Sequence, residues 1–316
     1  MGLFRSVQAV TGASGDGPVD WDAVAEAAKA STGPGSLDLP AAVREGYASD
    51  VRDARERVRE VSAVEFDVPE TVEIQNRHHW IDANIGTFRR VMDPLGEQVG
   101  MLPGIARVAN TASMSIALSF LAENVLGQYD PLLLADGSEH ALYFVHPNIG
   151  RVARMLDVSE PRFRRWIAFH EVAHAAEFGA APWLSEKLES DLETAIDALG
   201  EGHIDREALK ELDTTMTSVE GYAELLMDRA FDDEYADLRR KLDERRKGQG
   251  PIARLVRRLL GLGMKRRQYE RGKDFFETVA NARGVEAASK VWDSPENLPS
   301  DEEIDDPAAW LRRVDA

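Results

Sequence analysis

The feature that most constrains this chain is a helical stretch at positions 162–178, which contains no proline or glycine. At its centre is a His-Glu-x-x-His motif in which His170 and His174 are four residues apart, and the other residues from Phe169 to Ala175 are apolar apart from Glu171. Residues four apart on a helix share a face, with Cβ atoms about 5–6 Å apart, so both imidazoles can approach one metal ion. Because a helix of this composition can be buried, we expect it to lie in the core and to carry a structured metal site.

Glu171 lies between the two histidines in the sequence but points in another direction. It is turned about 100° from His170 around the helix axis, so it can reach a water on the metal without binding the metal itself. Neutral nitrogen ligands together with a separate carboxylate base are typical of zinc hydrolases. The motif therefore predicts a Zn²⁺ site at His170 and His174, with Glu171 as the catalytic base. The alternative is an ordinary core helix whose histidines are satisfied by hydrogen bonds.

The third metal ligand must come from another part of the chain. A metzincin would need glycine at 177 and histidine at 180, but this chain has Glu177 and Ala180 there. Glu177 lies about 10 Å along the helix axis from His170, which is too far to share its metal ion. The best candidates are Glu220 and Glu224, which share one face of an otherwise apolar helix.

Two carboxylates on such a helix are costly unless a cation neutralises them, and this is how a glutamate-zincin completes its site. We expect Glu220 to bind the metal and Glu224 to hydrogen-bond a ligand histidine. The reverse assignment and a solvated acidic face are the alternatives.

Two further residues are candidates for contacts with the reacting group. His203 follows a glycine-rich loop and could donate a hydrogen bond to an oxyanion, although a loop histidine is more often simply exposed. Tyr222 lies between the two glutamates but points away from both in an ideal helix, so it is the weaker candidate.

Composition restricts the metal chemistry and the surroundings of the protein. The 316 residues include no cysteine, which excludes disulfides and thiolate metal sites and leaves His, Asp and Glu as ligands. The net charge is −18, and arginine far outnumbers lysine. An acidic, lysine-poor surface is typical of a halophilic protein in a high-salt cytosol, although a biased genome could give the same arginine preference.

We expect a cytoplasmic protein without a membrane span. Polar residues interrupt the first 20 positions, which argues against a secretory signal. The longest apolar run, Ala112 to Ala122, is shorter than the roughly 20 residues that a membrane span requires.

The hydrophobic periodicity predicts an α+β fold that is mostly α-helical. Residues 1–40 are expected to be a loosely ordered N-terminal segment with a short helix at 21–30, and residues 41–316 a catalytic domain. Helices are expected at 40–65, 69–92, 104–126, 162–178, 183–199 and in the short stretch 308–314. Leu132–Leu134 and Ala141–Val145 are predicted to form a β-hairpin beside the motif helix. Such an edge strand could pair with an extended substrate, or the hairpin could be purely structural.

The chain resembles the zincin-like metallopeptidase type 2 family, whose members are often described as hydrolases or as associated with biosynthesis of the deazaflavin coenzyme. The resemblance rests on Gly127–Pro131, Val145–Asn148, His170–His174 with Pro182–Leu184, Val219–Gly221, Lys265–Tyr269, Trp292–Pro299 and Asp306–Trp310. It does not cover the first 40 residues. It implies a zincin-like, mostly helical α+β fold, with His170 and His174 as metal ligands and Glu171 as catalytic base. It does not imply a substrate.

A basic segment, residues 239–273, contrasts with the acidic remainder of the chain. It has 14 Lys or Arg residues against three Asp or Glu residues. A basic amphipathic helix can bind a membrane surface or nucleic acid, and it can equally dock on the protein's own acidic body, which is the interpretation we favour. The C-terminal segment, residues 292–316, is expected to wrap around the core.

The sequence as a whole predicts a zinc-dependent hydrolase, most plausibly a metallopeptidase that acts on a peptide or small amide substrate and does not bind nucleic acid. The competing hypothesis is a non-catalytic, zinc-stabilised scaffold that uses residues 239–273 to bind a partner, nucleic acid or a membrane surface. The intact Glu171 argues against a scaffold, because a structural zinc site needs no base.

Overall fold

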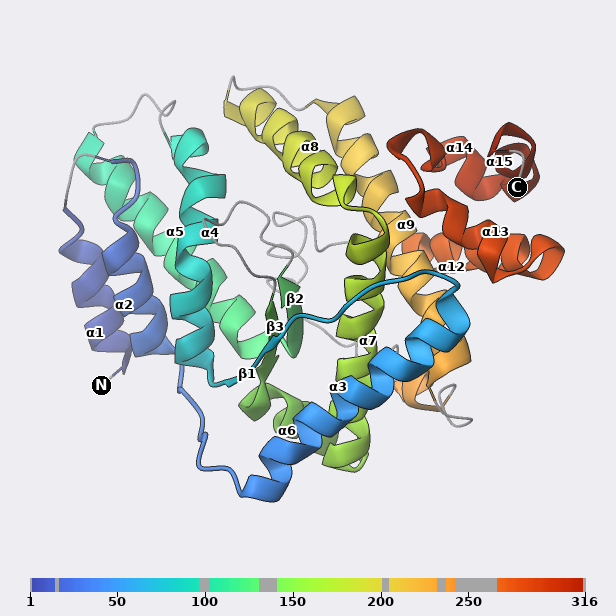
Figure 1. Cartoon of the computed structure of the whole chain (residues 1–316). Coiled ribbons are helices and arrows are strands. Elements are labelled where there is room, and N and C mark those ends of the chain that lie inside the picture. The colour runs from blue at the N-terminus through green and yellow to red at the C-terminus, as the bar shows by residue number, and fades with distance from the viewer. Residues whose placement is uncertain are drawn as a thin grey trace.

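The computed structural model describes residues 2–14, 17–96, 103–130, 141–200, 205–231, 237–241 and 266–314. These residues form a mostly helical α+β fold around one small sheet, as the sequence predicts (Figure 1). The helices are α1 (Gly2–Thr11), α2 (Trp21–Ser31), α3 (Ala41–Ser62), α4 (Arg77–Gly96), α5 (Pro103–Asn124), α6 (His146–Met155), α7 (Glu160–Ala180), α8 (Trp183–Gly200), α9 (Arg206–Ala230), α12 (Arg266–Arg283), α13 (Val285–Ser289), α14 (Asp301–Asp305) and α15 (Pro307–Val314). The strands are β1 (Thr71–Gln75), β2 (Gly127–Asp130) and β3 (Ala141–Val145).

The sheet has the strand order β1-β3-β2, with β1 parallel and β2 antiparallel to β3. Alternate residues of β3 face opposite sides, so the sheet separates two apolar clusters. Leu142 and Phe144 belong to the larger cluster, which includes residues of α3, α7, α9 and α12. Val145 belongs to the smaller cluster, which α2, α4 and α5 complete. The motif helix α7 therefore lies in the main core on one side of the sheet (Figure 1).

The predicted hairpin is only partly right. Its second strand is β3, as expected, but the antiparallel partner of β3 is Gly127–Asp130, a stretch whose composition indicates a break after the preceding helix. Leu132–Leu134, the predicted first strand, lies outside the described residues.

Strand β1 is absent from the elements that the sequence predicts. The pattern after Pro69 favours a helix, but Thr71–Gln75 is a strand, and the helix begins only at Arg77. The Asn76 side chain marks the change, because its Oδ1 accepts a hydrogen bond of 2.9 Å from the backbone N–H of His79, in the first turn of α4.

The N-terminal segment is more ordered than the sequence suggests. The helix predicted at 21–30 is confirmed as α2, and a further helix, α1, precedes it. Trp21 and Val24 of α2 are buried in the smaller cluster. Asp20 caps α2 by accepting a hydrogen bond of 3.0 Å from the N–H of Ala23. At the other end of the chain, Trp310 is buried in the larger cluster, so the C-terminal segment packs on the core.

The basic segment can be followed only at its two ends, because residues 242–265 lie outside the described residues. Within those ends, the basic side chains pair with acidic groups of the protein itself. Arg239 contacts Glu224 and Asp228, and Lys273 contacts Asp228 and Glu277. These contacts agree with docking on the acidic body for the ends of the segment, and the rest of the segment stays a prediction. Among the described residues, no helix is long and apolar enough to cross a membrane.

Candidate metal centre

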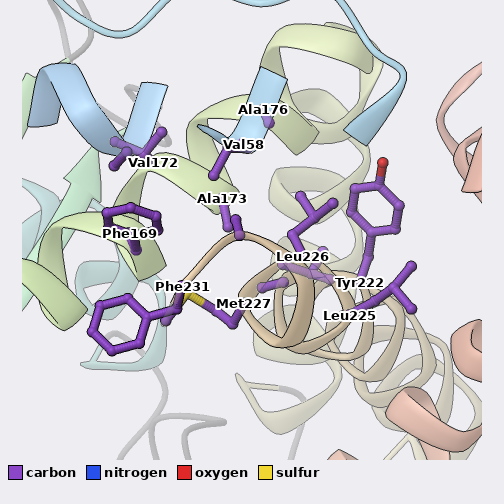
Figure 2. Packing of buried hydrophobic residues seen from close by; sticks show 14 of the residues in the cluster. Val58, Phe169, Val172, Ala173, Ala176, Tyr222, Leu225, Leu226, Met227 and Phe231 are labelled. Carbon is purple, nitrogen blue, oxygen red and sulfur yellow. The ribbon is translucent and has the colours of Figure 1, made fainter. Parts of the chain in front are cut away.

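The candidate site lies where α7 crosses α9, and apolar packing between these helices and α3 fixes the crossing. Figure 2 shows this packing, with Phe169, Val172, Ala173 and Ala176 from α7, Leu225, Leu226 and Met227 from α9, and Val58 from α3. The buried face of α7 leaves the motif histidines on its flank, where both are only half-buried. A buried apolar frame therefore supports histidine side chains that are partly exposed.

Three potential ligands meet at this crossing. His170 and His174 from α7 and Glu220 from α9 each offer one ligand atom, and these atoms lie within 4.8 Å of one another. The Nε2 atoms of the two histidines are 3.3 Å apart. Two nitrogens bound at about 2.05 Å to one tetrahedral zinc ion would also be about 3.3 Å apart. Two imidazole nitrogens, one carboxylate and this spacing fit a zinc ion.

The two histidines are held by different neighbours. The ring of His170 stacks on Trp166, one turn earlier, with ring centroids 5.5 Å apart and an angle of 7° between the planes. The Nδ1 atom of His174 lies 2.9 Å from the Oε2 atom of Glu177. Burial alone lowers the pKa of His174, but the Glu177 carboxylate outweighs it, so without a metal ion the pKa of His174 is raised. Contacts within the protein therefore define the orientations of both rings without a bound metal ion.

Glu171 is held by the edge strand β2 rather than by the histidines. Its Oε2 atom accepts a hydrogen bond of 2.8 Å from the backbone N–H of Tyr129. Gly127, two residues earlier, lies so close that a Cβ atom there would be 2.6 Å from the Oε1 atom of Glu171. Burial is the main cause that raises the pKa of Glu171, to about 7, and the charge of Glu220 acts in the same direction. The charge of His174 and the hydrogen bond from Tyr129 act in the opposite direction and lower this pKa. A carboxylate with such a pKa is suited to accept and return a proton near neutral pH.

Comparison with known proteins identifies the family of the chain and a similar solved structure. The model of the zincin-like metallopeptidase family matches residues 19–205 and 201–311. The chain belongs to this family. It is also similar to a solved structure from Chloroflexus aurantiacus, described as that of a candidate hydrolase with a novel fold. The two share 30% sequence identity with a TM-score of 0.75, and the match covers 99% of this chain and 98% of the other. No curated protein matches the chain.

Glu224 and Tyr222 occupy positions in this zincin-like fold that differ from those expected of them. Glu224 pairs with Arg239, with 3.2 Å between carboxylate and guanidinium, and the carboxylate beside His174 is that of Glu177. Tyr222 is fully buried, and its hydroxyl donates to the carbonyl of Ser62 at 2.9 Å. The remaining candidate, His203, lies outside the described residues.

Glu177 is the residue of this site that the ligand pattern in the sequence does not reveal, because the distance that excludes it as a ligand says nothing about a contact with His174. A signal was present: a glutamate three residues after the second motif histidine lies on the same side of the helix as that histidine.

Proposed function

We propose that this zincin-like protein is a zinc-dependent peptidase in which His170, His174 and Glu220 hold the metal ion and Glu171 is the general base. The observation that carries the proposal is the convergence of three ligand atoms within 4.8 Å, two of them on the helix that also carries Glu171. The family to which the chain belongs supports a metal-dependent hydrolase.

Zinc bound at this site would act as a Lewis acid that lowers the pKa of water and polarises a carbonyl group. Glu171 accepts a proton from the attacking water while the oxygen of that water bonds to the carbonyl carbon of the substrate. Glu171 then returns that proton to the amide nitrogen as the carbon–nitrogen bond breaks, so the proton count balances. Because Tyr129 fixes one carboxylate oxygen, little reorganisation of the base is needed for these two transfers.

The outer edge of β2 is suited to bind an extended peptide. The N–H of Val145 donates to the carbonyl of Leu126 at 2.9 Å, next to the pair Gly127–Phe144. Since hydrogen-bonded and non-hydrogen-bonded pairs alternate in an antiparallel ladder, the backbone groups of Gly127 and Tyr129 point away from β3. The Tyr129 N–H reaches Glu171, so this edge faces the candidate site. A peptide that pairs with the backbone of Gly127 and with the carbonyl of Tyr129 would pass the base, which favours a peptide over a compact amide substrate.

The test compares zinc content and hydrolysis in wild type, Glu171→Gln and a control, Glu186→Gln, which changes an exposed carboxylate on α8. We expect about one zinc per chain in all three proteins by inductively coupled plasma mass spectrometry. Cleavage of a mixed peptide library, followed by mass spectrometry, should occur with wild type and the control and be lost in Glu171→Gln. Wild-type protein that retains no zinc after resupply would refute the metal centre, and an active Glu171→Gln variant would refute the role of the base.

A further inference from the structure

Glu177 is a buried carboxylate that the packing of the core does not require. It is fully inaccessible to solvent, and its helix neighbours Ala173, Ala176 and Phe178 are buried apolar residues of the main core. Among the described residues, its Oε1 atom has no hydrogen-bond partner. Removing a carboxylate from water is costly unless a specific charged or hydrogen-bonding group compensates. The largest such contribution here comes from the His174 imidazole, and the backbone of Ala223 on α9 adds a smaller one.

The contact between the two residues determines which nitrogen of His174 faces the metal centre. Oε2 of Glu177 lies 2.9 Å from Nδ1 of His174, while Nε2 lies 3.3 Å from Nε2 of His170. A carboxylate that accepts from Nδ1–H leaves Nε2 as the nitrogen with the free electron pair. The same hydrogen bond fixes the rotation of the ring, because both of its ends are on α7, one turn apart.

We propose that Glu177 is the positioning residue of the metal centre: it holds His174 in the Nδ1–H form, so that Nε2 is presented to the metal ion. The inference rests on the proposed zinc site and adds to it a residue that does not touch the metal. Such hydrogen-bond partners of ligand histidines typically change metal affinity by about 10–100-fold when they are removed.

The structure also supplies a matched control on the opposite helix. Glu224 is a buried carboxylate near the same crossing, and it contacts Arg239 at 3.2 Å. Substitution of Glu224 therefore removes a buried negative charge close to the site without removing the hydrogen bond to His174.

The first experiment measures zinc affinity by competition with a chromophoric chelator in wild type, Glu177→Ala, Glu177→Gln and Glu224→Gln, with folding checked by circular dichroism. We expect Glu177→Ala to bind zinc about 10–100-fold more weakly than wild type. Glu177→Gln should lose less affinity, because its amide carbonyl can still accept from Nδ1–H. Glu224→Gln should bind zinc like wild type. If Glu177→Ala does not fold, the comparison of Glu177→Gln with Glu224→Gln decides, and equal affinity in these two variants overturns the proposal.

The second experiment observes the tautomer directly. In zinc-loaded wild type, the Nδ1 proton of His174 should give a protected low-field resonance in the proton NMR spectrum, and ¹⁵N correlation should assign it to Nδ1. The resonance should persist in Glu224→Gln and Glu177→Gln and disappear in Glu177→Ala. If wild type binds zinc and Glu177→Ala keeps both the wild-type zinc affinity and this resonance, the proposed role of Glu177 is overturned and the metal centre is not. Wild type that binds no zinc would overturn the metal centre as well.

Discussion

A methyl group added at Gly221 should disturb the fold and the metal centre together. Gly221 follows the candidate ligand Glu220 on α9 and lies against Gly272 of α12. A Cβ atom at position 221 would be 2.7 Å from the Cα atom and 2.7 Å from the carbonyl oxygen of Gly272. These are backbone atoms, which cannot rotate away as a flexible side chain could. Because ordinary carbon contacts are about 3.5–4.0 Å, the two helices would have to separate by roughly 1 Å.

The expected loss of stability follows from two opposing effects. Overpacking of a well-packed interior typically costs about 1–3 kcal/mol, and a contact with backbone belongs at the upper end. Replacement of glycine by alanine within a helix contributes about 1 kcal/mol in the other direction. We therefore expect Gly221→Ala to lower the free energy of unfolding by about 2 kcal/mol. Metal–ligand distances tolerate only about 0.2 Å, so a shift of roughly 1 Å next to Glu220 should also weaken zinc binding at least tenfold.

Urea denaturation and chelator competition measure the two effects separately. Gly86→Ala is the matched control, because Gly86 lies within helix α4 and a Cβ atom added there would meet no neighbouring group within 4 Å. That substitution should stabilise the protein by about 0.5–1 kcal/mol and leave zinc binding unchanged. Gly221→Ala protein with the stability and zinc affinity of wild type would refute the argument that this crossing positions Glu220.

Three further predictions follow from individual contacts. Gly127→Ala would place a Cβ atom 2.6 Å from the Glu171 carboxylate, so we expect retained zinc and about 100-fold slower peptide cleavage; cleavage at the wild-type rate would contradict the positioning of the base by β2. Tyr222→Phe removes the hydrogen bond to Ser62 and should cost about 1–2 kcal/mol in urea denaturation without changing zinc content, whereas lost cleavage at full stability would favour a catalytic Tyr222. Burial lowers the pKa of His146, so the folded state binds the imidazole proton more weakly than the unfolded state does. Protonation of the unfolded state therefore lowers the free energy of unfolding as the pH falls below about 6.5. The decline in stability between about pH 7 and pH 5 should be shallower in His146→Gln, and an equal slope would contradict this assignment.

Local patterns are enough to predict α7 and α9. The motif spacing and the uninterrupted stretch 162–178 are properties of one helix, and α7 spans Glu160–Ala180. Glu220 and Glu224 share one helix face, and the glutamate-zincin arrangement favours Glu220 as the ligand. The structure groups Glu220 with His170 and His174. Its role as a ligand stays a proposal that the zinc measurements test.

The sheet could not be predicted in the same way, because its strands depend on partners far away in the chain. Thr71 of β1 pairs with Ala141 of β3, and Gly127 of β2 is opposite Phe144. A five-residue strand after Pro69 has no helical or strand period long enough to distinguish it from the start of α4. Similarly, a glycine at position 127 suggests a turn from the sequence alone. In the structure, Gly127 lies in a strand, and glycine is required there because Glu171 and Ile167 leave no room for a side chain.

Glu177 illustrates a more general limit of reasoning by ligand geometry. Its distance from His170 along the axis excludes it from the metal, and that argument is sound for a ligand. A supporting residue needs only to reach His174, which is one turn away, and the 2.9 Å contact shows that it does. Helix α7 therefore carries two candidate ligands, the proposed base and the residue proposed to support His174, so most of the candidate centre is organised within one element. Among the described residues, Glu220 is the member of this group that comes from another helix, which makes the candidate centre depend on the α7–α9 crossing and, through Gly221, on the close approach of α12.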